Sequence, residues 1–178
     1  MQQKIVFFGG PGTGKTTIIN ELKKLGYPCL DEISREITAK AQKEGISQLF
    51  LEDPLLFSSK LLEGREMQFK SANELNEPVV FFDRGLPEVF GYMDYLGTEY
   101  PDRFVEKSKA YRYQKVIHFP VWEKIYTTDD ERYESLVEAQ KIEKYLIDAY
   151  ESLGYTVHSI PFGSIEQRTR YILNLIND

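Results

Sequence analysis

The chain has 178 residues, of which 42% are hydrophobic and 28% charged, enough for one domain with a sizeable core. A net charge of −6 argues against a broad surface for nucleic acid or for an anionic membrane. The single cysteine, Cys29, excludes an intrachain disulfide framework, and neither a signal peptide nor a run of ~18 apolar residues is found, so we expect a cytoplasmic protein.

Five short apolar runs predict β-strands. Several are apolar at successive positions rather than alternating, which is typical of a parallel sheet buried on both faces. Helical patterns separate the runs, so the chain is predicted to form a three-layer α/β fold of the P-loop NTPase type, as one domain over 1–178. The predicted strands are 5–8, 28–30, 79–82, 115–119 and 155–160.

A phosphate-binding loop follows the first run. Residues 9–16 read Gly-Gly-Pro-Gly-Thr-Gly-Lys-Thr, the Walker A pattern, and a helical pattern follows over 17–25. Glycines let the backbone wrap a phosphate chain, and the loop N–H groups and helix dipole attract the anion. The alternative is a glycine turn before a surface lysine. The predicted ATP-binding residues are Gly10, Pro11, Gly12, Thr13, Gly14, Lys15, Thr16 and Thr17.

Acidic residues follow the second strand, in Asp31-Glu32-Ile33-Ser34-Arg35. Glu32 is a candidate to accept the proton of an attacking hydroxyl or to position a substrate, with Arg35 one helical turn away. Capping of the next helix by the two carboxylates is the alternative. Two helical stretches, over 33–44 and 54–76, separate this strand from the third. We expect the insertion over about 31–78 to be either a cap over the ligand site or extra packing on the sheet.

The third strand ends in a carboxylate, because the apolar run 79–82 is followed by Asp83 and Arg84. This is the Walker B pattern, and we expect Asp83 to hold Mg²⁺ together with Thr16. Arg84 would clamp a phosphate or carboxylate. A salt bridge at the strand end is the alternative interpretation.

A long helix is predicted over 130–153, with an N-cap from 127–130 and an end at Gly154. Arg132 is a candidate to cover the γ-phosphate; otherwise it is a solvated charge at a helix start. Trp122, just after the fourth strand, either lies near the nucleotide or packs in the core. The last helix is predicted to begin at Gly163-Ser164.

Together these motifs resemble the small bacterial P-loop proteins called predicted AAA-type ATPases, which are similar to the nicotinamide riboside kinase domain of NAD-biosynthesis regulators. The layout also resembles nucleoside and nucleotide kinases, but Gly85 stands where thymidylate kinases have a bulkier residue. The motifs are the Walker A loop, Asp31-Glu32-x-x-Arg35, Phe82-Asp83-Arg84-Gly85, Phe119-Pro120-x-Trp122, Asp130-x-Arg132 and Leu153-Gly154-Tyr155.

The resemblance implies an ATP- and Mg²⁺-dependent kinase for a small-molecule acceptor, with no nucleic-acid or membrane partner. Glu32 would be the base, and Lys15, Arg84 and Arg132 would stabilise the transferring phosphoryl group. Glu32, Arg35 and Arg84 would contact the acceptor. An ATPase that acts as a switch and a nucleotide-sensing module remain alternatives, and the sequence leaves the acceptor and the oligomeric state open.

Overall fold

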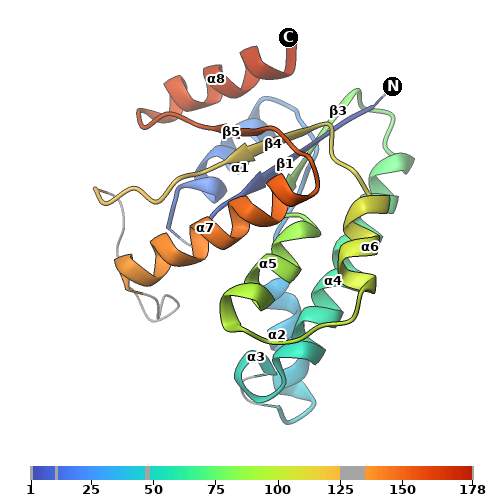
Figure 1. Cartoon of the computed structure of the whole chain (residues 1–178). Coiled ribbons are helices and arrows are strands. Elements are labelled where there is room, and N and C mark those ends of the chain that lie inside the picture. The colour runs from blue at the N-terminus through green and yellow to red at the C-terminus, as the bar shows by residue number, and fades with distance from the viewer. Residues whose placement is uncertain (1, 11, 47–48, 125–134, 178) are drawn as a thin grey trace.

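A computed structural model of the chain describes residues 2–10, 12–46, 49–124 and 135–177. Its strands form one sheet in the order β2-β3-β1-β4-β5, and every neighbouring pair is parallel, as the apolar runs predicted (Figure 1). The strands are β1 (Gln3–Phe8), β2 (Cys29–Leu30), β3 (Val79–Asp83), β4 (Lys115–His118) and β5 (Val157–Ser159).

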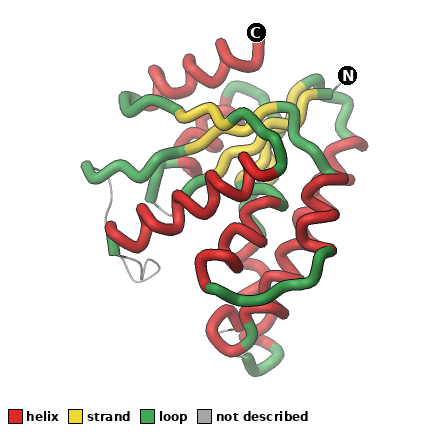
Figure 2. Tube along the Cα trace, in the orientation of Figure 1, coloured by secondary structure: helices red, strands yellow, loops and turns green. Residues whose placement is uncertain are grey.

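Helices cover both faces of the sheet, which gives the three predicted layers (Figures 1 and 2). Helices α1 and α8 pack on one face, and α4, α5 and α7 pack on the other. The helices are α1 (Lys15–Lys24), α2 (Ser34–Lys43), α3 (Leu49–Glu52), α4 (Pro54–Ser71), η1 (Ala72–Glu74), α5 (Pro87–Leu96), α6 (Arg103–Ala110), α7 (Leu136–Ser152) and α8 (Ile165–Asn177). No helix in the described ranges has both the length and the apolar character that a membrane crossing needs.

Successive apolar residues of β1 explain why this strand lies at the centre of the sheet. Ile5 and Phe7 point into the cluster that contains α1 and α8, whereas Val6 and Phe8 point into the opposite cluster. All four side chains are 0% exposed. A strand with two apolar faces is therefore buried on both sides, as expected for a parallel sheet.

The segment between β2 and β3 differs in detail from the two predicted helices. It contains α2, the short α3, α4 and the 3-10 turn η1. The break before α4 was predicted, because Pro54 occupies the first turn and Asp53 caps the helix by accepting from the Leu56 N–H at 2.9 Å. The predicted end at residue 76 was wrong, since Leu75 is already extended after η1.

The predicted start of the seventh helix was also wrong. Helix α7 begins at Leu136 because Ser135 and Glu138 form a capping box, in which each side chain bonds the other residue's backbone N–H. The N-cap predicted over 127–130 lies outside the described residues. The end of α7 was predicted correctly, with Gly154 in the left-handed region at φ 76°.

Candidate active site

The phosphate loop joins the end of β1 to the start of α1, as the Walker A pattern predicted. Gly9 has φ 137°, and a Cβ there would overlap the Phe119 carbonyl oxygen, so no other residue fits. Gly14 caps α1 in the left-handed region with φ 86°. The loop therefore brings the backbone to the N-terminus of a ten-residue helix, a geometry suited to anions.

Lys15 lies inside this loop. Its side-chain ammonium donates to the carbonyl oxygens of Gly9 at 2.9 Å and Gly10 at 2.6 Å and to Thr13 Oγ1 at 3.2 Å. Burial, with a smaller contribution from the charge of Arg84, lowers its pKa to about 8. The ammonium is thus bound to loop oxygens that a phosphate could replace.

Asp83 ends β3 and lies beside Phe7 of β1 in the parallel register. Its side chain is buried, and its Oδ1 atom has no hydrogen-bond partner in the described structure. Burial raises the pKa of this carboxyl group, against the lowering effect of Lys15 and Arg84. A buried acceptor without a donor needs an explanation, and a cation that binds oxygen supplies one.

Glu32 follows β2 and is held by four groups. Its Oε1 accepts from the backbone N–H groups of Ile33 at 2.9 Å and Ser34 at 3.0 Å. The carboxylate also pairs with Arg65 at 3.3 Å and with Arg84. Burial alone would raise its pKa, but the two arginines outweigh burial and the pKa lies below its usual value. The helix-capping interpretation is therefore observed for Glu32, whereas Asp31 pairs with Lys23 instead.

Arg84 has a strained backbone, with φ 73° in a non-glycine residue, and its N–H donates to the Phe7 carbonyl at 2.9 Å. Its guanidinium lies between Glu32 and Glu88 and pairs with both, the second at 3.1 Å. A salt bridge at the strand end is thus observed. Strain of this kind concentrates at functional sites, which agrees with the placement of Arg84 beside the phosphate loop.

A sequence model described as AAA domain matches residues 4–168. The chain belongs to this AAA domain family. A comparison of the chain with curated protein sequences found no match. The match to the AAA domain model confirms the family resemblance that motifs such as the phosphate loop and the Asp83-Arg84-Gly85 segment predicted.

Solved structures share the fold of this AAA domain at low sequence identity. Deoxyadenosine kinase from M. mycoides with the products dCMP and dCDP is 21% identical, covers 98% of this chain and 99% of its own, and gives a TM-score of 0.73. The same enzyme with dATP is 19% identical, covers 99% of this chain and 100% of its own, and gives 0.67. NadR protein in complex with NR is 16% identical, covers 99% of this chain and 50% of its own, and gives 0.73. The AAA domain therefore has a nucleoside-kinase-like P-loop fold.

The charged cluster beside the phosphate loop consists of Glu32, Arg65, Asp83, Arg84 and Glu88, and two of these residues were not predicted. Arg65 of α4 is 4% exposed and donates to the Gly85 carbonyl at 2.7 Å as well as to Glu32. Glu88 of α5 is 2% exposed and accepts from the Gly85 N–H at 2.9 Å. Glu88 left no usable signal, because Arg84 precedes α5 and the four-residue spacing of helical pairs does not apply to it. Arg65 left none either, because its partners are distant in sequence.

Other predicted residues lie apart from this cluster or outside the described ranges. Thr16 and Thr17 lie in the first turn of α1 and are exposed, and Arg35 is exposed in the first turn of α2. Pro11 and Arg132 lie outside the described residues. Within the described ranges, no group of three or more His, Cys, Asp or Glu side chains is arranged to hold a metal ion. A divalent cation would therefore rely on Asp83, Thr16 and the phosphates of its nucleotide.

Proposed function

We propose that this AAA domain is an ATP- and Mg²⁺-dependent phosphotransferase that acts on a small acceptor of the nucleoside or nucleotide type. The observation that carries the proposal is the placement of the Glu32 carboxylate, which pairs with Arg65 and Arg84 close enough to the phosphate loop for its charge to act on Lys15. An ATPase could use such a carboxylate to activate water, but the insertion between β2 and β3, which Arg65 ties to Glu32, favours an acceptor hydroxyl. A kinase uses it to receive the acceptor hydroxyl.

In the proposed reaction, the acceptor oxygen forms a bond to the γ-phosphorus of ATP while the bond to the β–γ bridging oxygen breaks. The hydroxyl proton passes to the Glu32 carboxylate, and ADP leaves with the bridging oxygen. Arg65 and Arg84 keep Glu32 ionised at neutral pH, so that it can accept this proton.

The phosphate loop would hold the triphosphate, with Lys15 moving from the loop carbonyls to the β- and γ-phosphates. Lys15, Arg84 and Arg132 would stabilise the charge that develops on the transferring group. Mg²⁺, when bound, neutralises phosphate charge, and Thr16 and Asp83 are the side chains that would hold it. The orphaned Oδ1 of Asp83 supports this assignment.

The insertion over about 31–78 would form the acceptor side of the site within one domain over 1–178. Support comes from Arg65 of α4, which bonds both Glu32 and the Gly85 carbonyl and so ties the insertion to the ends of β2 and β3. Arg35, exposed at the start of α2, is the residue we propose for contact with a polar group of the acceptor.

The test is ATP consumption measured against a panel of nucleosides, nucleotides and NAD precursors. We expect one acceptor class to raise turnover well above the acceptor-free rate, and Lys15→Ala to abolish that turnover. Lys24→Ala is the matched control, since Lys24 lies on the same helix with its side chain 74% exposed. A high acceptor-free rate that no acceptor changes would support the ATPase switch. Tight binding without turnover would support the nucleotide sensor.

The lowered pKa of Lys15 predicts pH-dependent nucleotide binding. With a pKa of about 8, free Lys15 is largely charged at pH 7 and largely neutral at pH 9. Phosphate favours the charged form, so binding above pH 8 takes up a proton, and the affinity falls by up to about tenfold per pH unit there. Calorimetry at pH 8.5 in buffers of different ionisation enthalpy measures this uptake. Lys15→Ala should show none, and equal enthalpies for the unchanged protein would contradict the prediction.

Asp83→Asn is expected to raise the Mg²⁺ concentration needed for half-maximal ATP binding by about tenfold, because it removes a buried carboxylate whose charge acts on Lys15 of the phosphate loop. Without Mg²⁺, the variant should bind ATP at least as tightly, since a like charge near the phosphates is removed. Asp102→Asn, on an exposed residue, is the control. An unchanged Mg²⁺ dependence would argue against a role of Asp83 in holding the cation.

A further inference from the structure

Arg168 of α8 is a buried cation outside the charged cluster. Its side chain is 4% exposed, and its Nη2 donates to the carbonyl oxygen of Thr13 in the phosphate loop at 3.1 Å. In the described part of the chain, no carboxylate pairs with it and its Nε has no hydrogen-bond partner. A buried guanidinium without a counter-charge is costly, so its retention calls for a specific role.

Aromatic rings supply the remaining contacts of Arg168. Its guanidinium lies 5.0 Å from the ring centre of Phe119 and 5.8 Å from that of Trp122. The Trp122 ring in turn stacks on Phe162, with centres 5.1 Å apart and an angle of 28°. Arg168 therefore joins the phosphate loop to an aromatic pair formed by the segments that follow β4 and β5.

The start of α8 fixes the position of this arginine. Ser164 and Gln167 bond each other reciprocally, through Gln167 Oε1 on the Ser164 N–H at 2.9 Å and Ser164 Oγ on the Gln167 N–H at 3.2 Å. Ile172 and Ile176 then pack α8 into the cluster that contains α1. Helices α1 and α8 thus pack in the same hydrophobic cluster, which holds Arg168 at a defined position relative to the phosphate loop.

Thr13 connects this arginine to Lys15. Its Oγ1 donates to the Gly10 carbonyl at 3.0 Å and accepts from the Lys15 ammonium at 3.2 Å, while its own carbonyl accepts from Arg168. A polyphosphate that draws Lys15 away removes one of the two bonds that hold Thr13 Oγ1. The bond from Arg168 would then hold the Thr13 peptide together with the remaining bond from Thr13 Oγ1 to Gly10.

We propose that Arg168 is a positioning residue for the phosphate loop and that it couples occupation of the loop by a polyphosphate to the environment of Trp122. The proposal rests on the proposed nucleotide binding but not on phosphoryl transfer. The hydrogen bond to Thr13 would orient the loop N–H groups toward the anion, and a shift of the loop would move the guanidinium over the Trp122 ring.

The test uses the fluorescence of Trp122, which is the single tryptophan of the chain. The full chain is titrated with inorganic triphosphate and Mg²⁺, and calorimetry measures binding in parallel. Triphosphate has no base that could contact Trp122 directly, so an emission change reports a change within the protein. We expect such a change in the unaltered chain. Arg168→Met should abolish it and weaken triphosphate binding about tenfold, as loss of a hydrogen bond from a charged donor predicts.

Arg168→Lys keeps one charged donor and should restore most of both effects, which a purely structural role for the side chain would not predict. If Arg168→Met does not fold, as judged by circular dichroism, Arg168→Gln replaces it with the same expected loss of emission response. Arg170→Met is the matched control, because Arg170 is exposed on the same helix and pairs with Glu166 at 2.6 Å. It should leave affinity and emission unchanged.

Two results would overturn the coupling while leaving nucleotide binding intact. One is triphosphate binding by calorimetry with no change in emission, and the other is an Arg168→Met variant that retains both the affinity and the emission response. Failure of the chain to bind either triphosphate or ATP would overturn nucleotide binding itself, and the coupling with it. The calorimetric arm therefore separates the two failures.

Discussion

Replacing Glu32 by glutamine is expected to lower the acceptor-stimulated turnover by about 10²- to 10⁴-fold, the usual contribution of a positioned general base. Affinity for ATP should change by less than about twofold, because the contacts of Glu32 lie with Arg65, Arg84 and the start of α2 rather than with the phosphate loop. Initial rates against acceptor and ATP concentrations, with calorimetry for ATP, measure the two effects separately.

The same substitution also changes stability, and pH separates that effect from the chemical one. The glutamine amide can still accept from the Ile33 and Ser34 N–H groups, but it no longer pairs with the buried Arg65. The folded-state pKa of Glu32 is lowered, so its stabilising contribution is present above the unfolded value of about 4.3 and is lost as the pH falls through the folded value. The difference in melting temperature between Glu32→Gln and the unaltered chain should therefore persist at pH 6–8 and shrink below about pH 4.

Glu36→Gln is the matched control, since Glu36 lies exposed in the first turn of α2, the helix that follows Glu32. It should leave both turnover and melting temperature unchanged. A Glu32→Gln variant that melts lower but keeps its full acceptor-stimulated turnover would show that Glu32 is a structural cap and not the base. A variant that loses acceptor-stimulated turnover while keeping ATP affinity would support the kinase assignment over the sensor.

The sheet could be predicted from sequence because its signals are local. Several strands contain successive apolar residues, and the glycines that the phosphate loop between β1 and α1 needs can be recognised from the loop's own sequence. Asp83 and Arg84 could be found because they follow directly on a buried strand. Even so, the sequence left open whether Arg84 would pair with a carboxylate of the protein or await a ligand, and the fold places it between Glu32 and Glu88.

The contacts that the sequence could not predict join residues far apart in the chain. Arg65 lies 33 residues from Glu32, and Arg168 lies 155 residues from Thr13, so neither pairing leaves a local pattern. The start of α7 was predicted wrongly for a different reason. It was predicted from a possible N-cap over 127–130, but the capping box of Ser135 and Glu138 decides where the helix begins.

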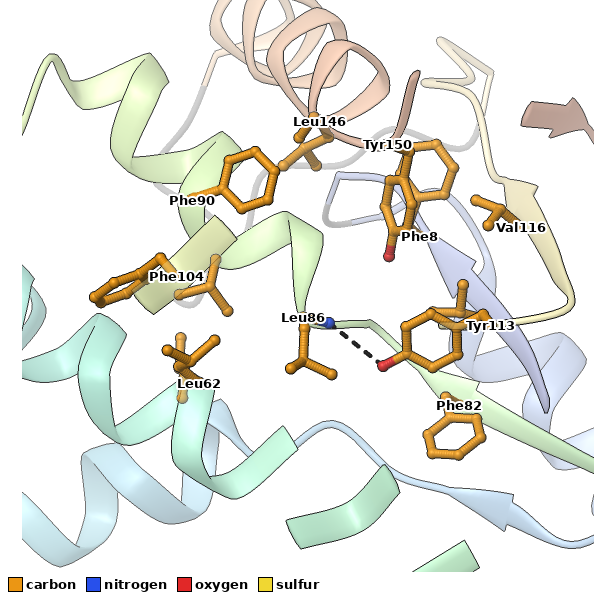
Figure 3. Packing of buried hydrophobic residues seen from close by; sticks show 14 of the residues in the cluster. Phe8, Leu62, Phe82, Leu86, Phe90, Phe104, Tyr113, Val116, Leu146 and Tyr150 are labelled. Carbon is orange, nitrogen blue, oxygen red and sulfur yellow. Dashed lines mark hydrogen bonds between the residues drawn. The ribbon is translucent and has the colours of Figure 1, made fainter. Parts of the chain in front are cut away.

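Gly85→Ala is expected to destabilise the fold by about 2–3 kcal/mol, because a Cβ there has no space. It would lie 2.6 Å from Tyr150 Oη and 2.9 Å from both Tyr113 Cε2 and Val6 Cγ2. Figure 3 shows Tyr113 and Tyr150 in the packed cluster around Leu86, whose N–H donates to Tyr113 Oη at 3.4 Å. For a chain of this length the melting temperature should fall by about 5–10 °C, measured by circular dichroism or calorimetry.

The effect of Gly85→Ala should reach the site as well as the core. The Gly85 carbonyl accepts from Arg65 and its N–H donates to Glu88, so a shift of this peptide moves the partners of Glu32 and Arg84. The bulkier residue of thymidylate kinases is excluded here for the same reason: two tyrosines fill its space.

Tyr150→Phe in the Gly85→Ala background tests this cause, since it removes the nearest atom. By itself the change should cost little, because the Tyr150 hydroxyl makes only a 3.5 Å hydrogen bond to Glu88. In the double variant it should restore about 1 kcal/mol, seen as a non-additive change in melting temperature. Strictly additive effects would mean that the loss in Gly85→Ala arises from the backbone at residue 85 and not from the overlap with Tyr150.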